Sequence, residues 1–268
     1  LEPVSAENLH SNRGVRNFWL VDEDGQAFSV SGASARQEAD RFTPAQDDSR
    51  LTAGLMWQTV ERTAQDLGLD TEVTAFCPWQ DNVEILCITV RNQQEQPRWL
   101  TPIAAVPLYG RSADNIRDHR NVTSMLHRIW TTENGVMVRP TMSFDERGHR
   151  PNHKVYYVEG FGPEGQKPEA FYPTVESFLG EGGTYLHPRA VYEQYPGVKA
   201  GSRAEGREAM GAFRFPAITL APGQEAHYVL LLGVEDSEEA VNAIWDKYHS
   251  WEQVQAVLDE TRSYWKET

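Results

Sequence analysis

The segment Val83-Glu-Ile-Leu-Cys-Ile-Thr-Val-Arg91 is apolar on both faces at its centre when it is read as an extended chain. A strand that buries both of its faces lies between two layers of structure. Residues 72–76 form another apolar segment before it, and Pro78-Trp-Gln-Asp-Asn82 between the two has the composition of a turn. We therefore expect this pair of strands at the centre of a layered β-protein.

Further strand segments lie on both sides of this pair. Residues 17–21 and 27–30 flank Asp22-Glu-Asp-Gly25, a turn signal that predicts a hairpin. The remaining expected strands are residues 55–63, residues 154–159, and a last pair, 208–220 with 226–234, joined at Ala221-Pro-Gly223. The first half of the chain and much of the second are thus rich in strands.

Two segments are harder to interpret. Residues 122–132 fit helical spacing and strand alternation alike, but Asn134-Gly135 follows and marks a tight turn to residues 136–139, which favours a strand. Residues 99–109 are a long apolar run that contains Pro102 and Pro107. Because proline cannot donate a ladder hydrogen bond, we expect this run to be an edge strand or a bulged strand.

After residue 235 the sequence changes from strand patterns to helix patterns. Asp236-Ser-Glu-Glu239 and Ser250-Trp-Glu-Gln253 both carry helix-capping patterns. The first precedes a helical apolar stripe of Ala240, Val241, Ile244, Trp245 and Tyr248, and the second precedes a stripe of Val254, Val257, Leu258, Thr261 and Trp265. We expect a β-domain over residues 1–235 and a helical segment over residues 236–268.

Composition narrows the possible function. The 268 residues carry a net charge of −14, which argues against nucleic acid, because phosphate binding needs clustered Lys and Arg. No run approaches a membrane span, and no signal peptide is visible. The two cysteines, Cys77 and Cys87, flank the turn at residues 78–82, so a cross-strand disulfide and buried free thiols are both open.

One segment combines aromatic rings, carboxylates and a flexible backbone: Phe171-Tyr-Pro-Thr-Val-Glu-Ser-Phe-Leu-Gly-Glu-Gly-Gly-Thr-Tyr-Leu-His187. Its Gly and Pro content argues against a helix, and we expect residues 160–187 to form a long loop region. A sugar-binding loop uses these residue types. Glu176 and Glu181 are also candidates for the carboxyl groups that glycoside cleavage requires, as are Asp145 and Glu146, although ordinary surface carboxylates are the alternative.

Other polar clusters are less specific. Residues 111–120 are dense in charge and could meet a ligand or another domain, or form a solvated loop. His149 and His153 have the spacing of a helical zinc pair, but Pro151 lies between them, so we expect a polar loop and no metal site. The sequence contains no nucleophile elbow, P-loop or dinucleotide fingerprint.

Several segments together resemble the N-terminal β-sandwich region of glycoside hydrolase family 94. They are Asn12-Arg-Gly-Val-Arg-Asn-Phe-Trp-Leu-Val-Asp-Glu-Asp-Gly25, Arg117-Asp-His-Arg-Asn-Val-Thr-Ser-Met-Leu126, Thr141-Met-Ser-Phe-Asp-Glu-Arg147, Phe171-Tyr-Pro-Thr-Val-Glu-Ser-Phe-Leu-Gly180 and Leu220-Ala-Pro-Gly-Gln-Glu225. The family contains cellobiose and chitobiose phosphorylases, 1,2-β-oligoglucan phosphorylases and the phosphorylase-like part of cyclic β-1,2-glucan synthases. The β-1,2-glucan branch looks closest.

The resemblance implies an all-β fold, a large antiparallel supersandwich similar to galactose mutarotase, followed by a helical linker to an (α/α)6 barrel. In the family, the general acid is an Asp of the barrel, and inorganic phosphate is the co-substrate of the phosphorylases. Since the sequence stops before any barrel, no catalytic residue and no cofactor is assigned to this chain. Its expected partners are a β-glucan oligosaccharide and the barrel of the same polypeptide, and the resemblance allows a homodimer.

The same resemblance suggests where this domain meets its partners. The loop residues Tyr172, Phe178 and Tyr185 are candidates for stacking on sugars, and Glu176, Glu181 and His187 for hydrogen bonds to hydroxyls. These residues could instead pack against the barrel or a partner subunit. Arg117, Asp118, His119 and Arg120 are candidates for the domain interface.

Two other functions stay open. One is a self-sufficient enzyme like an aldose epimerase, which would need a His–carboxylate pair in an open cleft, with His127 or His153 as the candidate base. The other is a free-standing carbohydrate-binding module. The resemblance implies a cytoplasmic location, or the cytoplasmic face of the inner membrane if the chain is part of a cyclic glucan synthase.

Overall fold

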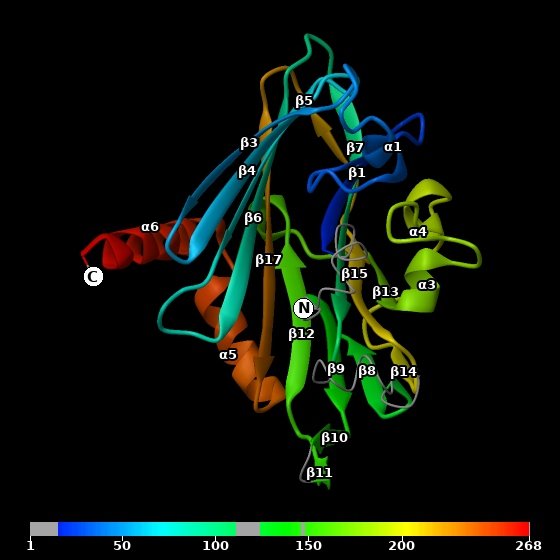
Figure 1. Ribbon diagram of the computed structural model, residues 1–268, viewed down its shortest axis with the longest axis vertical. Helices are drawn as coiled ribbons and strands as arrows, with labels where there is room; N and C mark the ends of the chain where they lie inside the picture. The colour runs from blue at the N-terminus through cyan, green and yellow to red at the C-terminus, as the bar shows by residue number, and fades with distance from the viewer. Residues whose placement is uncertain (1–15, 111–123, 146–147, 268) are drawn as a thin grey trace.

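A computed structural model describes residues 16–110, 124–145 and 148–267 of the chain, and two antiparallel sheets that face each other dominate it (Figure 1). Within these residues the larger sheet has nine strands in the order β14-β8-β9-β12-β17-β6-β5-β4-β3. Their bounds are β3 Asp48–Gly54, β4 Trp57–Ala64, β5 Leu69–Phe76, β6 Val83–Asn92, β8 His127–Thr131, β9 Gly135–Pro140, β12 Val155–Phe161, β14 Arg203–Glu205 and β17 Glu225–Glu235.

The smaller sheet runs in the order β13-β15-β7-β1-β2, with β16 also paired to β7. Its strands are β1 Asn17–Asp22, β2 Ala27–Ser29, β7 Arg98–Leu108, β13 Ala170–Thr174, β15 Ala209–Arg214 and β16 Ile218–Leu220. A separate hairpin consists of β10 Met142–Asp145 and β11 Gly148–Pro151. The expected all-β supersandwich is confirmed, as are the hairpin β1–β2 and the turn from β8 to β9.

Strand β6 is buried on both faces, as its sequence predicts. Leu86, Ile88 and Val90 belong to the core between the two sheets, where they join residues such as Phe18 and Phe213. The alternate side chains Val83, Ile85 and Cys87 face the opposite way and belong to a second apolar cluster on the outer face of the larger sheet. The layer that covers this outer face is helical.

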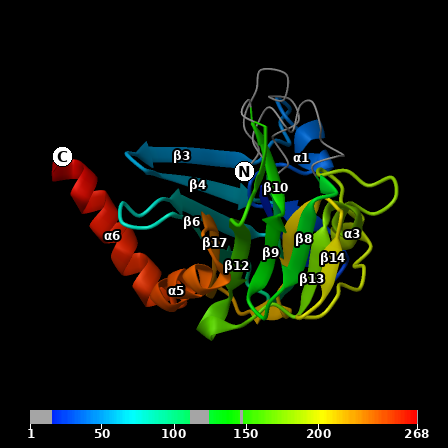
Figure 2. The same ribbon diagram turned by 90° about the horizontal axis from the view of Figure 1, so that it is seen from below.

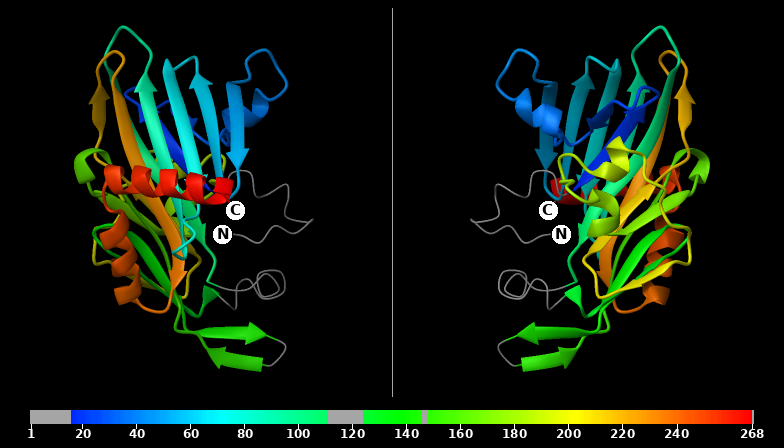
Figure 3. Two further views of the ribbon diagram at one scale, coloured as in Figure 1. Left: turned by 90° about the vertical axis from the view of Figure 1, so that its left-hand side faces the viewer. Right: turned by 90° about the vertical axis from the view of Figure 1, so that its right-hand side faces the viewer.

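Helices α5 Glu238–Tyr248 and α6 Trp251–Glu267 form that covering layer. Helix α6 begins where its capping pattern predicts, because Ser250 Oγ accepts a bond from the backbone N–H of Gln253. Helix α5 begins one residue later than its pattern predicts, because Ser237 and not Asp236 is the N-cap, and Ser237 Oγ accepts from the backbone N–H of Ala240. Val241, Ile244 and Tyr248 of α5 and Val254 and Leu258 of α6 are buried against the sheet. Figure 2 shows both helices along the sheet, and Figure 3 shows α6 crossing over its strands. Among the helices described, none is long and apolar enough to cross a membrane.

The short helix α1 Ala35–Ala39 lies beside the edge strand β2, and two others, α3 Val175–Leu179 and α4 Arg189–Tyr192, cover the outer face of the smaller sheet (Figure 1). A third apolar cluster lies beneath them and includes Trp19, Ile103, Phe178 and Val191. The molecule is therefore layered as helices, small sheet, large sheet, helices. Cys87 is buried in the helix-covered cluster, and neither it nor Cys77 forms a disulfide.

The prediction that residues 99–109 form an edge or bulged strand is wrong, because β7 lies inside the smaller sheet between β15 and β1. Pro102 is tolerated because it faces a place where the neighbouring ladder is interrupted. The backbone of Pro102 faces the gap between β15 and β16, where its carbonyl accepts a bond from Phe215 N–H at 3.0 Å.

The last predicted strand pair is also wrong in its pairing. Strand β15 pairs with β7 and β13, and β16 pairs with β7, all in the smaller sheet. Strand β17 pairs with β6 and β12 in the larger sheet. The turn at residues 221–224 therefore carries the chain from one sheet to the other, which local turn chemistry alone does not reveal.

Candidate functional site

The segment Phe171–His187 is more ordered than its composition predicts. Its first residues belong to β13, and α3 follows directly, so the expectation of one loop over residues 160–187 is wrong for this part. A capping box begins the helix: the Thr174 hydroxyl accepts from the Ser177 N–H, and the Ser177 hydroxyl accepts from the Thr174 N–H, both at 3.1 Å. Gly180, with φ 69°, ends it.

Two of the proposed sugar-stacking residues are part of the core. Tyr172 and Phe178 are each 1% exposed, and their rings meet edge to face with centroids 6.1 Å apart. The Tyr172 hydroxyl donates a hydrogen bond to the carbonyl of Tyr195 at 2.7 Å. Neither ring has a free face for a sugar in this structure, because alternation along β13 and the helical turn of α3 direct both side chains inward.

The other proposed binding residues lie nearer the surface. Glu176 is exposed and forms an ion pair with Arg207 at 3.0 Å, and Glu181 is exposed with its carbonyl bonded by Arg189 at 3.0 Å. The exposed ring of His187 stacks on Tyr192 with centroids 3.7 Å apart and planes 17° apart. Tyr185 is half-buried beside the cluster under α3 and α4. These four residues share one surface around α3 and α4.

The predicted interface residues Arg117, Asp118, His119 and Arg120 lie outside the described residues, as does Glu146. His149 belongs to β11, and His153 is exposed between β11 and β12. Among the described residues, no cluster of three or more His, Cys, Asp or Glu side chains could hold a metal ion.

The surface around α3 and α4 continues to α1. The carbonyl of Leu186 accepts a hydrogen bond from the backbone N–H of Ala35 at 2.8 Å, which fixes the start of α1 to the loop. Tyr192 of α4 also packs on the smaller sheet, because its ring meets the buried Trp19 of β1 edge to face with centroids 5.9 Å apart. The loop that the sequence singles out thus supports α1, and a polar pocket lies on the far side of this helix.

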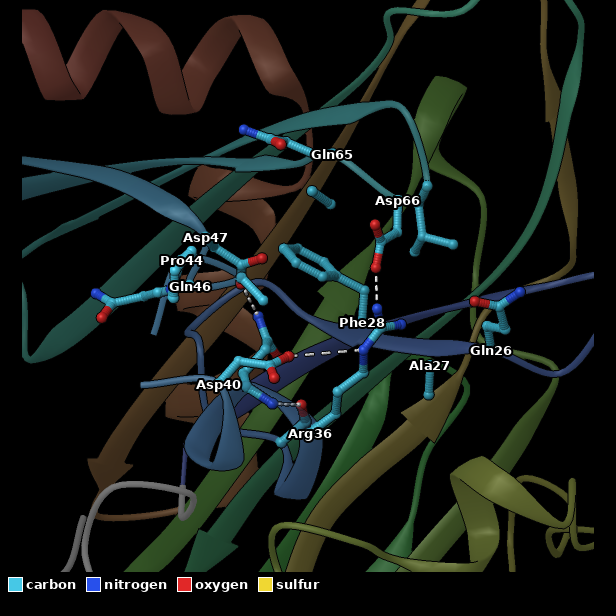
Figure 4. Close-up of a pocket in the computed structure, with 15 residues that line it drawn as sticks. Gln26, Ala27, Phe28, Arg36, Asp40, Pro44, Gln46, Asp47, Gln65 and Asp66 are labelled. Atoms are coloured by element: carbon cyan, nitrogen blue, oxygen red, sulfur yellow. Dashed lines mark hydrogen bonds and ion pairs between the residues drawn. The ribbon is translucent and has the colours of Figure 1, made fainter. Parts of the chain in front are cut away.

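Figure 4 shows this pocket, which has a volume of about 110 Å³. Arg36 of α1 lies between two carboxylates: it is bonded to Asp66 in the turn after β4, and its Nε is 3.8 Å from Asp40 Oδ2. Phe28 of β2 contributes an apolar wall. The lining is otherwise rich in carboxamides, namely Gln26, Gln37, Gln46 and Gln65. Planar amides and carboxylates beside one ring are suited to hydroxyl groups and a small apolar face.

Sequence reasoning missed this pocket. The available signal is Ser34-Ala-Arg-Gln37, which has the spacing of a capping box. In the structure, Ser34 Oγ accepts from the Gln37 N–H at 3.1 Å and begins α1. The Gln37 side chain then donates to Asp47 Oδ2 at 2.7 Å and to the Ser29 carbonyl at 3.1 Å, so it ties α1 to both β2 and the segment before β3.

Glu159 has the raised pKa that a general acid needs, but its carboxyl group is not accessible to a substrate. Burial raises its pKa to about 7, although bonds from Thr132 and Asn134 act in the opposite direction. Its side chain is 1% exposed on β12 beneath the turn from β8 to β9, and Thr132 Oγ1 donates to Glu159 Oε1 at 3.3 Å. A substrate cannot reach this carboxyl group in the described conformation, so we do not assign it a catalytic role.

Comparison with known proteins adds a family relationship. The family model described as glycosyl hydrolase 94, supersandwich domain, matches residues 1–251. No curated protein matches the chain.

Similar solved structures include a bacterial glucoamylase complexed with acarbose, at 10% identity and a TM-score of 0.45, over 93% of this chain and 31% of that one. A putative kojibiose phosphorylase from the human microbiome has 7% identity and a TM-score of 0.36, over 93% of this chain and 25% of that one. A putative aldose 1-epimerase from Escherichia coli K12 has 9% identity and a TM-score of 0.32, over 71% of this chain and 68% of that one. The chain thus spans less than a third of the glucoamylase and of the phosphorylase.

Proposed function

Because this chain belongs to the supersandwich domain family of glycosyl hydrolase 94, we propose that it is a non-catalytic domain that binds carbohydrate and supports the active site of a larger enzyme. The observation that carries the proposal is the family match over residues 1–251, which includes both sheets and α5. The parent enzyme is a β-glucan phosphorylase or a cyclic β-1,2-glucan synthase. Its catalytic acid lies on an (α/α)6 barrel, and phosphate is the co-substrate if it is a phosphorylase.

The geometry around α3 and α4 supports a role at the entrance of an active site. Glu176, Glu181 and His187 are exposed on short elements that the buried rings of Tyr172 and Phe178 hold against the smaller sheet. Polar groups on a rigidly supported rim can bind hydroxyls with little loss of conformational freedom. We propose that this rim faces the barrel and contacts a β-1,2-linked glucan at its mouth, in a monomer or across a homodimer.

The alternative of a self-sufficient epimerase has less support. Of its two candidate bases, His127 is 1% exposed, and its Nδ1 lies 3.1 Å from the carbonyl oxygen of Arg207. His153 is exposed in the connection from β11 to β12. Within the part of the chain that the structure describes, the buried His127 and the exposed His153 therefore do not provide the open cleft, lined by His and a carboxylate, that ring opening of an aldose would need.

Phosphorolysis tests the proposed function. The 268-residue chain and the complete natural polypeptide are each incubated with inorganic phosphate and β-1,2-, β-1,3- or β-1,4-linked gluco-oligosaccharides, and sugar 1-phosphate is measured. If the parent enzyme is a β-1,2-glucan phosphorylase, only the complete polypeptide releases sugar 1-phosphate, and it does so fastest from the β-1,2-linked substrate. If the parent enzyme is a cyclic glucan synthase, the complete polypeptide forms cyclic β-1,2-glucan from a nucleotide sugar. Release by the 268-residue chain alone at an enzyme-like rate would overturn the proposal, and mutarotation of glucose by that chain would support the epimerase instead.

We propose a cytoplasmic location, or the cytoplasmic face of the inner membrane for a synthase. This follows from the family relationship and is tested by fractionating cells that produce the natural polypeptide.

A further inference from the structure

Phe42 is an aromatic residue in an unusual position. Its side chain is 91% exposed, the most of any large hydrophobic residue described, and it follows α1 in the connection to β3. Its φ of 63° lies in the left-handed region, which is rare for a bulky side chain and costs free energy. The backbone N–H of Phe42 donates to Gln46 Oε1 at 2.6 Å, so the conformation is held by a specific contact.

Two further contacts next to Phe42 stabilise the segment that connects α1 to β3. Arg41 forms an ion pair with Glu38 at 2.6 Å, and the Thr43 hydroxyl donates to the Asp40 carbonyl at 2.7 Å. Because the Phe42 ring is exposed, the strained conformation of this turn buries no additional apolar surface in the core. Strained residues of this kind occur at ligand-binding positions, where the fold presents a side chain outward.

A polar pocket of about 310 Å³ lies beside this ring. The residues that line it include Gly32, Gln37, Arg41, Gln46, Asp47 and Arg62. The Arg62 side chain is 15% exposed, and its Nη1 is 3.8 Å from Asp47 Oδ2. Its Nε is buried and has no hydrogen-bond partner in the part of the chain that the structure describes.

Gly32 makes room for the Arg62 side chain. A Cβ at Gly32 would lie 2.4 Å from Arg62 Nη2, so the guanidinium packs directly over this glycine. The backbone of Gly32 also has φ 77°, which a side chain would strain. The fold therefore places a partly desolvated guanidinium against the pocket, with donor capacity that Asp47 alone does not use.

We infer that Phe42 and this adjoining pocket form a subsite for a neutral oligosaccharide. One sugar ring places its C–H face on Phe42, and its hydroxyls bond with Arg62, Asp47 and Gln46. Aromatic faces attract polarised C–H groups, and planar guanidinium, carboxylate and carboxamide groups each accept or donate two bonds to neighbouring hydroxyls.

The charges favour a neutral ligand over an anion. Arg41 is neutralised by Glu38, and Arg62 lies beside Asp47, so the lining carries little net charge. The chain as a whole is at −14, which repels phosphates and polyanions.

A second sugar unit can be placed beside the first. The pocket of Figure 4 shares Gln37, Gln46 and Asp47 with the Phe42 pocket, and Gln37 donates to Asp47 Oδ2 at 2.7 Å. The carboxylates and amides around Arg36 would bind the hydroxyls of the neighbouring unit. The subsite therefore suits an oligosaccharide better than a single sugar.

This inference rests on the proposed function for its ligand class, but its test does not depend on phosphorolysis. The 268-residue chain is titrated calorimetrically with β-1,2-linked and β-1,4-linked glucotriose. The variants are Phe42→Ala, Phe42→Trp and Gln46→Ala, and the control is Leu55→Ala, which removes another exposed apolar side chain (63%) away from this pocket. Circular dichroism verifies that each variant is folded.

We expect Phe42→Ala to weaken binding by about tenfold or more, Gln46→Ala to weaken it less, and Phe42→Trp and Leu55→Ala to bind like the parent. Equal binding by Phe42→Ala and the parent would overturn the subsite, as would no binding of either trisaccharide at about 10 mM. Phe42-dependent binding by a polypeptide that shows neither phosphorolysis nor glucan synthesis would refute the proposed parent enzyme and leave the subsite intact.

Discussion

The hydroxyl of Tyr248, at the end of α5, donates a hydrogen bond to Asp81 Oδ2 at 2.5 Å, in the turn between β5 and β6. Lys247 Nζ binds the other oxygen, Asp81 Oδ1, at 2.6 Å. One carboxylate thus connects the helical layer to the β5–β6 hairpin of the larger sheet. Burial alone would raise the pKa of Asp81, but the bonds from Lys247 and Tyr248 outweigh it and hold the pKa below its usual value.

We expect Asp81→Asn to lower the free energy of unfolding by about 1–2 kcal/mol at pH 7, because the charge-assisted bonds are lost. Since the folded pKa is depressed, this stability is present above the unfolded pKa and disappears as the pH falls through the folded value. The gap between parent and variant should therefore close below about pH 4. Urea unfolding at several pH values measures it, with Asp259→Asn on the exposed side of α6 as the control. A gap that is constant with pH would contradict the assignment.

Glu159 should make stability fall as the pH rises. Burial raises its pKa from 4.5 to about 7, so between these values the folded state keeps a proton that the unfolded state releases. The parent should lose roughly 3 kcal/mol across this window, and Glu159→Gln should not show this loss. Urea unfolding at pH 5 and pH 8 compares the two, and the exposed Glu164→Gln serves as the control. Equal pH slopes for the parent and Glu159→Gln would show that the carboxyl group is not desolvated as described.

Tyr172 and Phe178 should contribute to folding and not to sugar binding. Phe178→Ala is expected to cost about 3–5 kcal/mol, because it leaves a cavity under α3, and Tyr172→Phe about 1 kcal/mol, because it loses the bond to the Tyr195 carbonyl. Chemical denaturation measures both effects, with the exposed Glu181→Gln expected to change stability by less than about 0.5 kcal/mol. If Tyr172→Phe weakened glucotriose binding at unchanged stability, the ligand would reach this ring.

Local sequence patterns predicted the individual strands and helices better than they predicted which of these elements lie next to each other. Strand β6 and the capped helices follow from apolar periodicity and capping residues, which act within one element. The position of β7 does not, because whether Pro102 harms a ladder depends on where the partner strand happens to be interrupted. The pocket beside Phe42 is harder still to predict from the sequence. The residues of α1, of β3 and Arg62 of β4 meet there only through tertiary packing. In addition, β3 is exposed at all seven positions, so it has no apolar pattern that would mark it as a strand.

Phe42→Gly separates the strain of this residue from its role. Glycine adopts the φ of 63° without steric cost, so we expect the variant to be as stable as the parent or up to about 1 kcal/mol more stable. It also lacks the ring, so glucotriose binding should weaken as in Phe42→Ala. Thermal unfolding and calorimetric titration give the two readouts, and Phe42→Ala, which keeps the strain, is the matched comparison. Marked destabilisation by Phe42→Gly would mean that the ring packs against the protein after all.

The helices after residue 235 should be required for the sandwich to stay soluble. A fragment of residues 1–235 would expose the apolar outer face of the larger sheet, which includes Phe76, Ile85, Cys87, Met137, Tyr157, Phe161, Val229 and Leu231. Exposed apolar surface of this extent leads to association. We expect the fragment to aggregate or to bind a hydrophobic dye strongly, whereas the full chain stays monodisperse in size-exclusion chromatography.

A pair of substitutions on α6 tests the same contact without truncation. Val254→Asp introduces a charge at a position that is 0% exposed and should destabilise the whole domain by several kcal/mol, whereas Ala256→Asp on the exposed side should have little effect. Cooperative folding of residues 1–235, with the same near-ultraviolet dichroism as the full chain, would instead make residues 236–268 a separable linker. In that case the helices would serve mainly to connect the sandwich to the proposed barrel, and the outer face of the sheet would need another partner to cover it.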